Sequence, residues 1–247
     1  MNYKLSEGDS NSSFGIKIKN KVKPISLTQT NGTDEIEIKT GVMQHTPNKN
    51  KERDILYISG QSGSGKSYYT FDYATQYQKM YPKRDVFLFS SVNDVSTIDK
   101  IKHLKKIDIR KPEFIGMDIP LEEFRDSLVI FDDVDSIHDK QLKKAVWAVM
   151  SNILTMGRHH NISAIITYHV ATAGAETKLV LNESQSITLF PNSMGGRSLK
   201  YLLDSYLGLD KKQIKKIKSL DSRWVTILKT YPKMVLHEKG SYILRND

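Results

Sequence analysis

The residues best suited to chemistry form a glycine-rich loop in the first third of the chain. The loop matches the pattern G-x-x-x-x-G-K-[S/T] at every position, follows an expected strand and opens an expected helix. Glycines let successive backbone N–H groups turn inward toward phosphates, and a helix N-terminus adds the positive end of its dipole. The pattern therefore predicts a nucleotide-binding loop. It consists of Gly60, Gln61, Ser62, Gly63, Ser64, Gly65, Lys66 and Ser67.

Two side chains of this loop and two later carboxylates have distinct expected roles. Lys66 is expected to reach the β- and γ-phosphates, and Ser67 to offer its hydroxyl to Mg²⁺. The apolar stretch 128–131 ends in Asp132 and Asp133, at the edge of a parallel sheet where ligands bind. We expect Asp132 to hold Mg²⁺ opposite Ser67. Asp133 is expected to point the other way, because strand side chains alternate, and to orient or deprotonate a water.

The expected nucleotide is ATP with Mg²⁺. Near this strand the sequence has neither Asn-Lys-x-Asp nor Asp-x-x-Gly, the patterns that mark GTPases. A phosphate loop alone does not name a reaction. A small-molecule P-loop kinase therefore stays open, although it would need an arginine-rich lid and an acceptor pocket. A non-hydrolysing scaffold that binds DNA and uses ATP as a switch also stays open.

Short apolar runs must form the strands that position these residues. Nearly continuous runs of strand length suit strands covered on both faces. Between them, residues 141–157 carry apolar side chains at spacings of three and four, which predicts a helix ending at Gly157. Strands that alternate with helices predict an α/β fold with a mostly parallel sheet and helices on both faces. The expected strands are 55–58, 86–89, 128–131, 162–166 and 187–190.

The two ends of the chain differ from this pattern. Residues 1–52 are polar, with alternating stretches at 14–19 and 35–39 that predict half-buried strands in a partly disordered N-terminal β extension. We therefore divide the chain into this extension and an ATPase domain over 53–247. Near the end, helices are expected around 199–206 and 211–217, followed by an antiparallel pair, 224–228 with 235–244.

Composition excludes several kinds of site and favours anionic partners. The chain has 37 Lys and Arg against 28 Asp and Glu, a net charge of +9, and no cysteine. The missing cysteines exclude disulfides, thiolate metal sites and a cysteine nucleophile. Adjacent histidines at 159–160 with His169 do not have zinc-site spacing, so no zinc is expected. No apolar run is long enough to span a membrane or to form a signal peptide.

Two lysine-rich segments, 99–111 and 209–218, are the candidates for contact with a polyanion. A solvated helix face is the ordinary meaning of such a pattern. Lysines without interleaved aromatic residues also suit sequence-independent contact with the phosphates of a DNA duplex.

The sequence resembles the FtsK–HerA superfamily of P-loop motor ATPases, and within it the genome-packaging ATPases of large double-stranded DNA viruses and virophages. The resemblance covers about residues 54–244. It rests on the phosphate loop, the strand 128–133 and the stretch 157–169, where a basic residue, a turn and a strand with a polar end follow in order. It implies a RecA-like fold.

The resemblance also implies roles for residues of the stretch 157–169. Arg158 takes the place of an arginine finger that acts across a subunit interface, although Arg197 and Arg223 compete for this role and a surface arginine at a helix end is the alternative. His169 takes the place of a sensor that is usually glutamine in bacterial motors, so activity would vary with pH near neutrality. Thr167 is the second candidate for the sensor.

At the level of function, the resemblance implies an ATP-driven translocase that packages double-stranded DNA into a preformed capsid. Such a motor works as a homo-oligomeric ring, expected to be a hexamer, with capsid proteins as partners. Its expected place is a virus factory in the host cytoplasm, or the virion. Asp133 departs from the glutamate usual in bacterial members and agrees with the viral packaging group.

Overall fold

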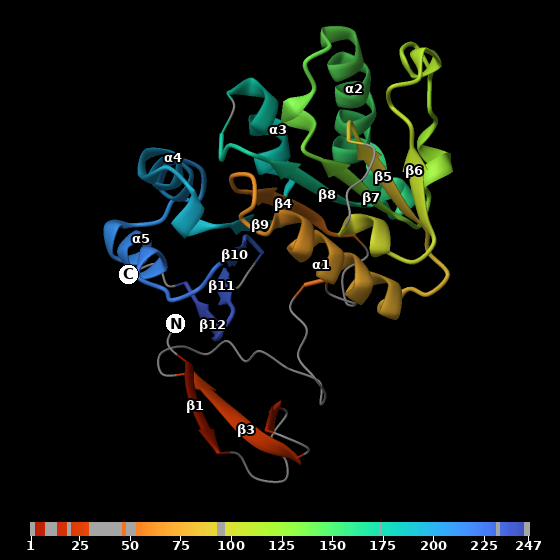
Figure 1. Cartoon of the computed structure of the whole chain (residues 1–247). Helices are drawn as coiled ribbons and strands as arrows, with labels where there is room; N and C mark the ends of the chain where they lie inside the picture. Colours follow the sequence, from red (N-terminus) through yellow and green to blue (C-terminus); the bar gives the residue numbers. More distant parts are fainter. Residues whose placement is uncertain are drawn as a thin grey trace.

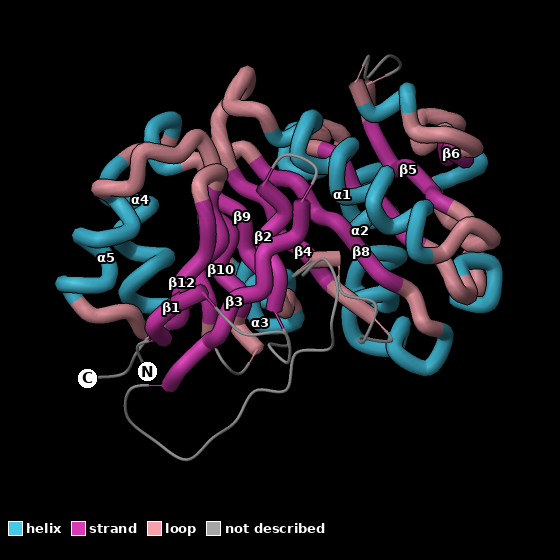
Figure 2. Tube along the Cα trace, turned by 90° about the horizontal axis from the view of Figure 1, so that it is seen from below, coloured by secondary structure: helices cyan, strands magenta, loops and turns pink. Residues whose placement is uncertain are grey.

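One large sheet runs through the part of the chain that carries the predicted motifs (Figure 1, Figure 2). The computed structural model describes residues 3–7, 14–18, 21–29, 46–47, 53–92, 97–172, 174–230 and 233–244. Nine strands form the sheet, and each of the five strands predicted from apolar runs is present. In spatial order they are β12 (Gly240–Ile243), β11 (Met234–His237), β10 (Val225–Leu228), β9 (Ser186–Leu189), β4 (Ile55–Ser59), β8 (Ser163–Tyr168), β7 (Leu128–Asp132), β5 (Val86–Ser90) and β6 (Leu104–Ile107).

The six strands from β9 to β6 are parallel, which confirms the mostly parallel sheet. Every residue of β4, β7 and β8 is buried, and this is why their sequences are nearly continuous apolar runs. Because the strands are parallel, their carboxyl ends meet at one edge of the sheet. The phosphate loop follows β4 there, the paired aspartates follow β7, and His169 follows β8.

Helices cover both faces, as predicted. Neighbouring residues of β4 divide between two hydrophobic clusters, so these clusters lie on opposite faces of the sheet. Helix α1 packs on one face through Tyr73 and Tyr77, whereas α2, α3 and α5 pack on the other through Val149, Val180 and Ile214. The helices are α1 (Lys66–Met80), α2 (Lys140–Met156), α3 (Ala175–Glu183), α4 (Gly196–Tyr201, continued by a π-helical turn, Leu202–Tyr206) and α5 (Lys211–Lys218).

The sheet ends in an antiparallel unit of three strands. Residues 224–228 form β10 as expected, but the predicted partner strand 235–244 is a hairpin of β11 and β12. Its turn lies at Glu238 and Lys239, directly before Gly240. At the opposite edge of the sheet, strand β6 lies within the lysine-rich segment 99–111, where no strand was predicted.

The N-terminal extension contains a separate three-stranded antiparallel sheet. Its order is β1 (Tyr3–Glu7), β3 (Lys21–Gln29) and β2 (Phe14–Ile18). Strand β2 agrees with the alternating stretch at 14–19, whereas the predicted strand at 35–39 lies outside the described residues. Within the described part of the chain, every helix is too short or too polar to cross a lipid bilayer.

Candidate active site

The phosphate loop is a turn that only glycine can form at key positions. Gly63 and Gly65 have positive φ angles of 74° and 113°, in the region that side chains other than glycine rarely adopt. At Gly60 a Cβ would lie 2.6 Å from Ser64 Oγ and 2.8 Å from the ring of Phe190, so a side chain does not fit. The loop therefore closes tightly at its start and leads directly into α1.

Lys66 is the buried centre of this loop. Its side chain is 6% exposed; Nζ donates a hydrogen bond to the carbonyl oxygen of Gly60 at 2.9 Å and lies 3.3 Å from Asp133 Oδ1. The ammonium group thus faces the loop and the end of β7 at once. Gln61, Ser62 and Gly63, at the tip of the loop, are exposed, so the loop lies at the surface of the protein.

Asp132 ends β7 as a buried carboxylate, 4% exposed. Burial, and after it the negative charge of Asp133, raise the pKa of the Asp132 carboxyl to about 6. A hydrogen bond from Thr167 and the positive charges of Lys66 and His169 act in the opposite direction. At neutral pH the structure therefore holds an anionic side chain in an environment that disfavours its charge.

The expectation that Asp133 points away from Asp132 is wrong. Strand β7 ends at Asp132, and Asp133 has left-handed backbone angles (φ 46°, ψ 43°), so the alternation rule of a strand no longer applies. Thr167 Oγ1, on the neighbouring strand, lies 3.1 Å from Asp132 Oδ1 and 3.1 Å from Asp133 Oδ1. It also accepts a hydrogen bond from the backbone N–H of Asp133 at 2.7 Å. Both carboxylates therefore lie on the same side.

His169 lies between two carboxylates. Its Nε2 is 3.3 Å from Asp133 Oδ2, and its Nδ1 is 3.2 Å from Asp135 Oδ1. Asp135 Oδ2 also accepts a hydrogen bond from the backbone N–H of His169 at 2.8 Å. Asp135 thus fixes both the backbone and the ring of His169, and the ring in turn contacts Asp133. A neutral imidazole has one N–H, so it donates to only one of the two carboxylates at a time.

The residues at this edge fit a divalent cation bound with a nucleotide. Among the described residues, the Asp132 carboxylate has one hydrogen-bond donor, Thr167, and no cationic side chain within 4 Å. A buried carboxylate with a raised pKa and a second carboxylate beside it provide the oxygen donors and the uncompensated charge that Mg²⁺ requires. Ser67, half-buried in the first turn of α1, would supply the hydroxyl oxygen.

The three candidate arginines lie at different edges of the sheet. Arg158 is exposed and precedes β8, at the amino edge. Six residues of β8 separate it from the phosphate-loop edge, a strand length of about 20 Å. The exposed Arg197 and Arg223 follow β9 and precede the antiparallel β10, so both lie at the phosphate-loop edge. Arg158 therefore does not belong to the site of its own chain.

Other histidines lie away from this site. His160 Nδ1 is 3.0 Å from a guanidinium nitrogen of Arg125, and Nε2 is 3.8 Å from Glu122. Within the described ranges, Asp133, Asp135 and His169 are the three side chains whose ligand atoms lie close enough to share a metal ion. This group belongs to the site already described.

Two residues of the site were missed as functional residues. Asp135 was not among the predicted site residues, and only its place three residues after Asp132 links it to the site in the sequence. Phe190, which closes the loop against Gly60 and Gly65, follows β9 and carries no polar signal. Both contacts depend on strands that are distant in sequence, and therefore on the order of strands in the sheet.

Comparison with known proteins identifies relatives of the chain and of its fold. No protein-family model matches the chain. A protein of Sputnik virophage is 36% identical over 233 residues, which cover 93% of each chain. Among solved structures, the DNA-packaging ATPase B204 from Sulfolobus turreted icosahedral virus has the same fold, with a TM-score of 0.53 and 16% identity over 75% of this chain and 97% of that one. The chain belongs to the family of the Sputnik virophage protein, and its RecA-like fold agrees with the resemblance to the FtsK–HerA superfamily that its motifs carry.

Proposed function

We propose that the chain is a Mg²⁺-dependent ATPase. The observation that carries this proposal is the meeting of Lys66, Asp132 and Asp133 at one edge of the sheet, with Asp133 Oδ1 only 3.3 Å from the lysine of the phosphate loop. Bound Mg²⁺ would neutralise charge on the β- and γ-phosphates. Asp133, held by Thr167 and His169, is positioned to accept a proton from a water that attacks the γ-phosphate.

The work coupled to hydrolysis in this proposal is the packaging of double-stranded DNA into a preformed capsid. The name of B204 as a DNA-packaging ATPase, its shared fold and the virophage relative support this reading. The net charge of +9 suits a polyanionic partner. Capsid proteins are the proposed further partners, and a virus factory in the host cytoplasm, or the virion, is the proposed location.

A ring of identical subunits, proposed as a hexamer, follows from the place of Arg158. An arginine at the amino edge is too far from its own phosphate loop, whereas a head-to-tail contact would bring it to the loop of the next subunit. Contacts of this kind form a ring when the rotation between neighbouring subunits closes, and an open filament when it does not. Arg158 is then the arginine finger, whose effect in characterised cases is roughly 10³–10⁵ in rate.

An assay of phosphate release, with and without duplex DNA, tests the core of the proposal. Wild-type protein should hydrolyse ATP only with Mg²⁺ and faster with duplex DNA. Lys66→Ala should abolish turnover, because the charge that binds the phosphates is removed. Lys79→Ala removes the same charge from the exposed end of the same helix and should leave turnover unchanged. Equal rates for the two variants would refute the assignment.

The same assay separates the alternatives. Asp133→Asn keeps the shape of the side chain but removes its basicity, so turnover should fall roughly 100- to 10,000-fold while ATP still binds. Unchanged turnover in this variant would show that Asp133 is not the base, whereas a wild type that binds ATP without turnover would favour a protein that uses ATP only as a switch. Phosphate transfer to a small acceptor, with no release to water, would favour a kinase.

Mixed rings test the role of Arg158. If each arginine completes the site of its neighbour, Arg158→Ala subunits should inactivate wild-type subunits in the same ring. Activity should then fall more steeply than the fraction of wild-type protein. A linear decline would mean that Arg158 does not act across the interface, and Arg197→Ala mixtures provide the matched comparison.

A further inference from the structure

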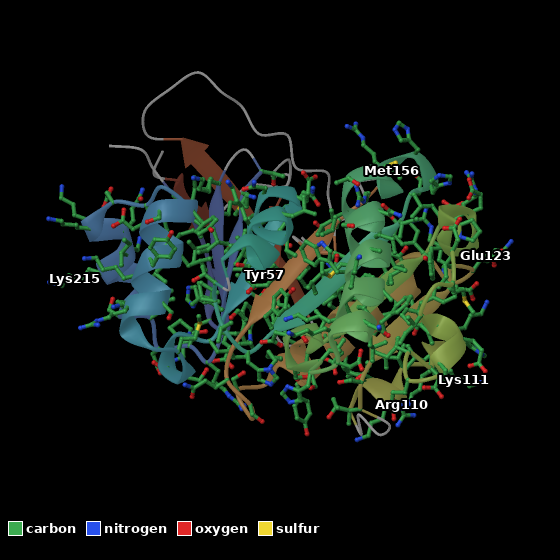
Figure 3. The ribbon with its side chains drawn as sticks, turned by 90° about the horizontal axis from the view of Figure 1, so that it is seen from above. Tyr57, Arg110, Lys111, Glu123, Met156 and Lys215 are labelled. Atoms are coloured by element: carbon green, nitrogen blue, oxygen red, sulfur yellow. The ribbon has the colours of Figure 1, made fainter. Side chains whose placement is uncertain are left out.

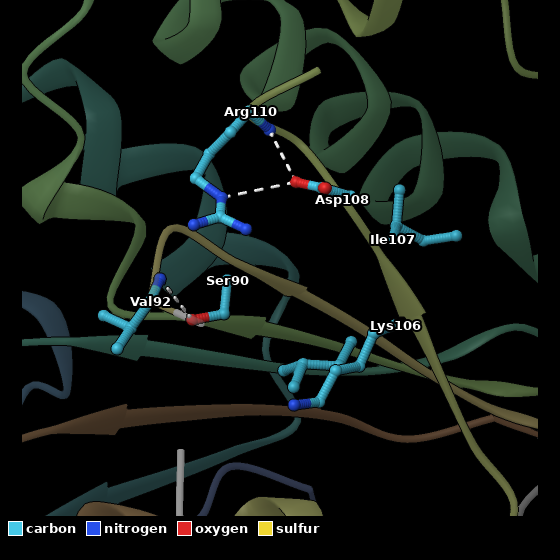
Figure 4. A pocket seen from close by; sticks show the side chains of 7 residues that line it. Ser90, Val92, Lys106, Ile107, Asp108 and Arg110 are labelled. Carbon is cyan, nitrogen blue, oxygen red and sulfur yellow. Dashed lines mark hydrogen bonds and ion pairs between the residues drawn. The ribbon is translucent and has the colours of Figure 1, made fainter. Parts of the chain in front are cut away.

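The two lysine-rich segments are similar in sequence, but in the structure they differ in how their charges are paired. In the segment 99–111 three of the six lysine and arginine side chains pair with carboxylates. Lys105 pairs with Asp85 at 2.8 Å, and Lys106 with Asp99 at 2.7 Å. Arg110 Nε lies 3.3 Å from Asp108, at the mouth of the small hollow between β5 and β6 (Figure 4). This surface therefore mixes carboxylates and local ion pairs with its three remaining lysines, Lys100, Lys102 and Lys111, so its positive charge is partly neutralised.

Helix α5 is the opposite case. Five of its eight residues are exposed lysines, and none of its residues is acidic. Among the described residues, Lys211, Lys215 and Lys218 have no carboxylate within salt-bridge distance. Figure 3 shows Lys215 at the outer edge of the molecule, far from Arg110 and Lys111. The positive charges of these three lysines therefore face solvent without a carboxylate partner.

This arrangement is unfavourable within the chain itself. Lys211 with Lys215, and Lys215 with Lys218, stand four and three residues apart, where like charges destabilise a helix. The helix is held in place by other means. Asp210 and Gln213 form a capping box at its start, and Ile214 and Ile217 are buried beneath it. A rigid scaffold thus holds three cations together although they repel each other.

We infer that the exposed lysines of α5 are a contact surface for the phosphate backbone of duplex DNA. This inference rests on the proposed function and assigns its DNA contact to one of two candidate surfaces. The span from Lys211 to Lys218 is about 10 Å along the helix, comparable to the length of strand that carries about three phosphates. Lysine is a point charge without the forked geometry that reads bases, so the contact is independent of sequence.

The buried face of α5 argues against a membrane surface as the partner. Helices that lie in a membrane interface insert an apolar face into the lipid. On α5 the apolar residues Ile214 and Ile217 are 7% and 0% exposed and pack in the protein core. Only charged side chains remain on the outside, and Lys216 already lies 3.8 Å from the ring of Tyr242.

Two variants with the same loss of charge test the inference. One replaces Lys211, Lys215 and Lys218 with Gln, and the control replaces the exposed Lys100, Lys102 and Lys111 with Gln. Binding of a labelled duplex is measured by fluorescence anisotropy across salt concentrations. Loss of three phosphate contacts should make the slope of log K against log salt less steep by about 2.7 for the α5 variant. The control should retain a slope close to that of the wild type.

The outcomes are distinct. Equal slopes for both variants, whether changed or unchanged, would overturn the assignment to α5 while leaving the proposed function intact. A wild-type protein that does not bind duplex DNA would overturn both. Loss of binding to anionic phospholipid vesicles by the α5 variant, with duplex binding intact, would show that the surface serves a membrane and would also overturn the inference. Because Gln has good helix propensity and removes the repulsion between lysines on α5, the α5 variant should unfold at or slightly above the wild-type temperature.

Discussion

Asp132→Asn should stabilise the metal-free protein while abolishing its activity. The pKa of Asp132 is raised from 3.8 to about 6, first by burial and then by the charge of Asp133. The folded state therefore holds its proton more tightly than the unfolded chain does. As pH rises from about 4 to 6, the unfolded chain ionises first, so stability falls through this window and the loss is complete above it.

The size of the effect follows from the shift. About two pH units at 1.36 kcal/mol each give roughly 3 kcal/mol of destabilisation at pH 7. Asparagine has nearly the same shape and still accepts the hydrogen bond from Thr167. Its free energy of unfolding at pH 7 should therefore exceed that of the wild type by most of this amount. For a domain of this size, 3 kcal/mol corresponds to an increase of roughly 6–12 °C in unfolding temperature.

Thermal unfolding with a chelator and without nucleotide, at several pH values, measures this prediction. Asp132→Asn should unfold at a higher temperature than wild type at pH 7, and the difference should shrink as pH falls toward 4. Asp118→Asn changes an exposed carboxylate and should have no such effect. With Mg²⁺ and ATP the order should reverse, because only wild type gains the free energy of ligand binding. An Asp132→Asn protein that is less stable than wild type at pH 7 would show that the charged Asp132 carboxylate does not lower the free energy of unfolding.

Three further changes should have separable effects. Arg53→Met removes three hydrogen bonds to backbone carbonyls at the end of α2 and at the start of β8, so urea unfolding should show a loss of roughly 2–4 kcal/mol. Asp135→Asn weakens the hold on His169, and kcat should fall about tenfold with little change in KM; a change in KM alone would argue against a positioning role. Gly60→Ala should abolish ATP binding in a filter assay, whereas Gly195→Ala, with open space around its Cβ, should bind normally.

The sheet could be predicted from sequence because its central strands are buried on both faces. Such strands appear as uninterrupted apolar runs, and the order of motifs along the chain then places the phosphate loop and the paired aspartates at one edge. The phosphate loop could also be predicted from sequence. Its backbone needs positive φ angles that favour glycine, and this local requirement does not depend on the rest of the fold.

The orientation of Asp133 could not be predicted in the same way. The alternation rule holds only while the strand continues, and no residue type marks Asp132 as its last position. Thr167 stabilises the left-handed Asp133 from a strand 34 residues further along. The ion pair of Lys105 was hidden for a similar reason, since its partner Asp85 precedes a different strand.

Two unfavourable features of the structure, at Asp132 and Asp133, lie where the nucleotide is proposed to bind. The raised pKa of Asp132 lowers the stability of the folded protein by about 3 kcal/mol at neutral pH. The left-handed backbone of Asp133 lowers it by about 1 kcal/mol or more. Lys66, with Gly60 and Asp133 as its present partners, stands where phosphates would take their place. A ligand that supplies a cation to Asp132 and anions to Lys66 relieves both groups together. We therefore expect Mg²⁺ and ATP to stabilise the fold more in combination than the sum of their separate effects, because each alone leaves one of the two charges unmatched.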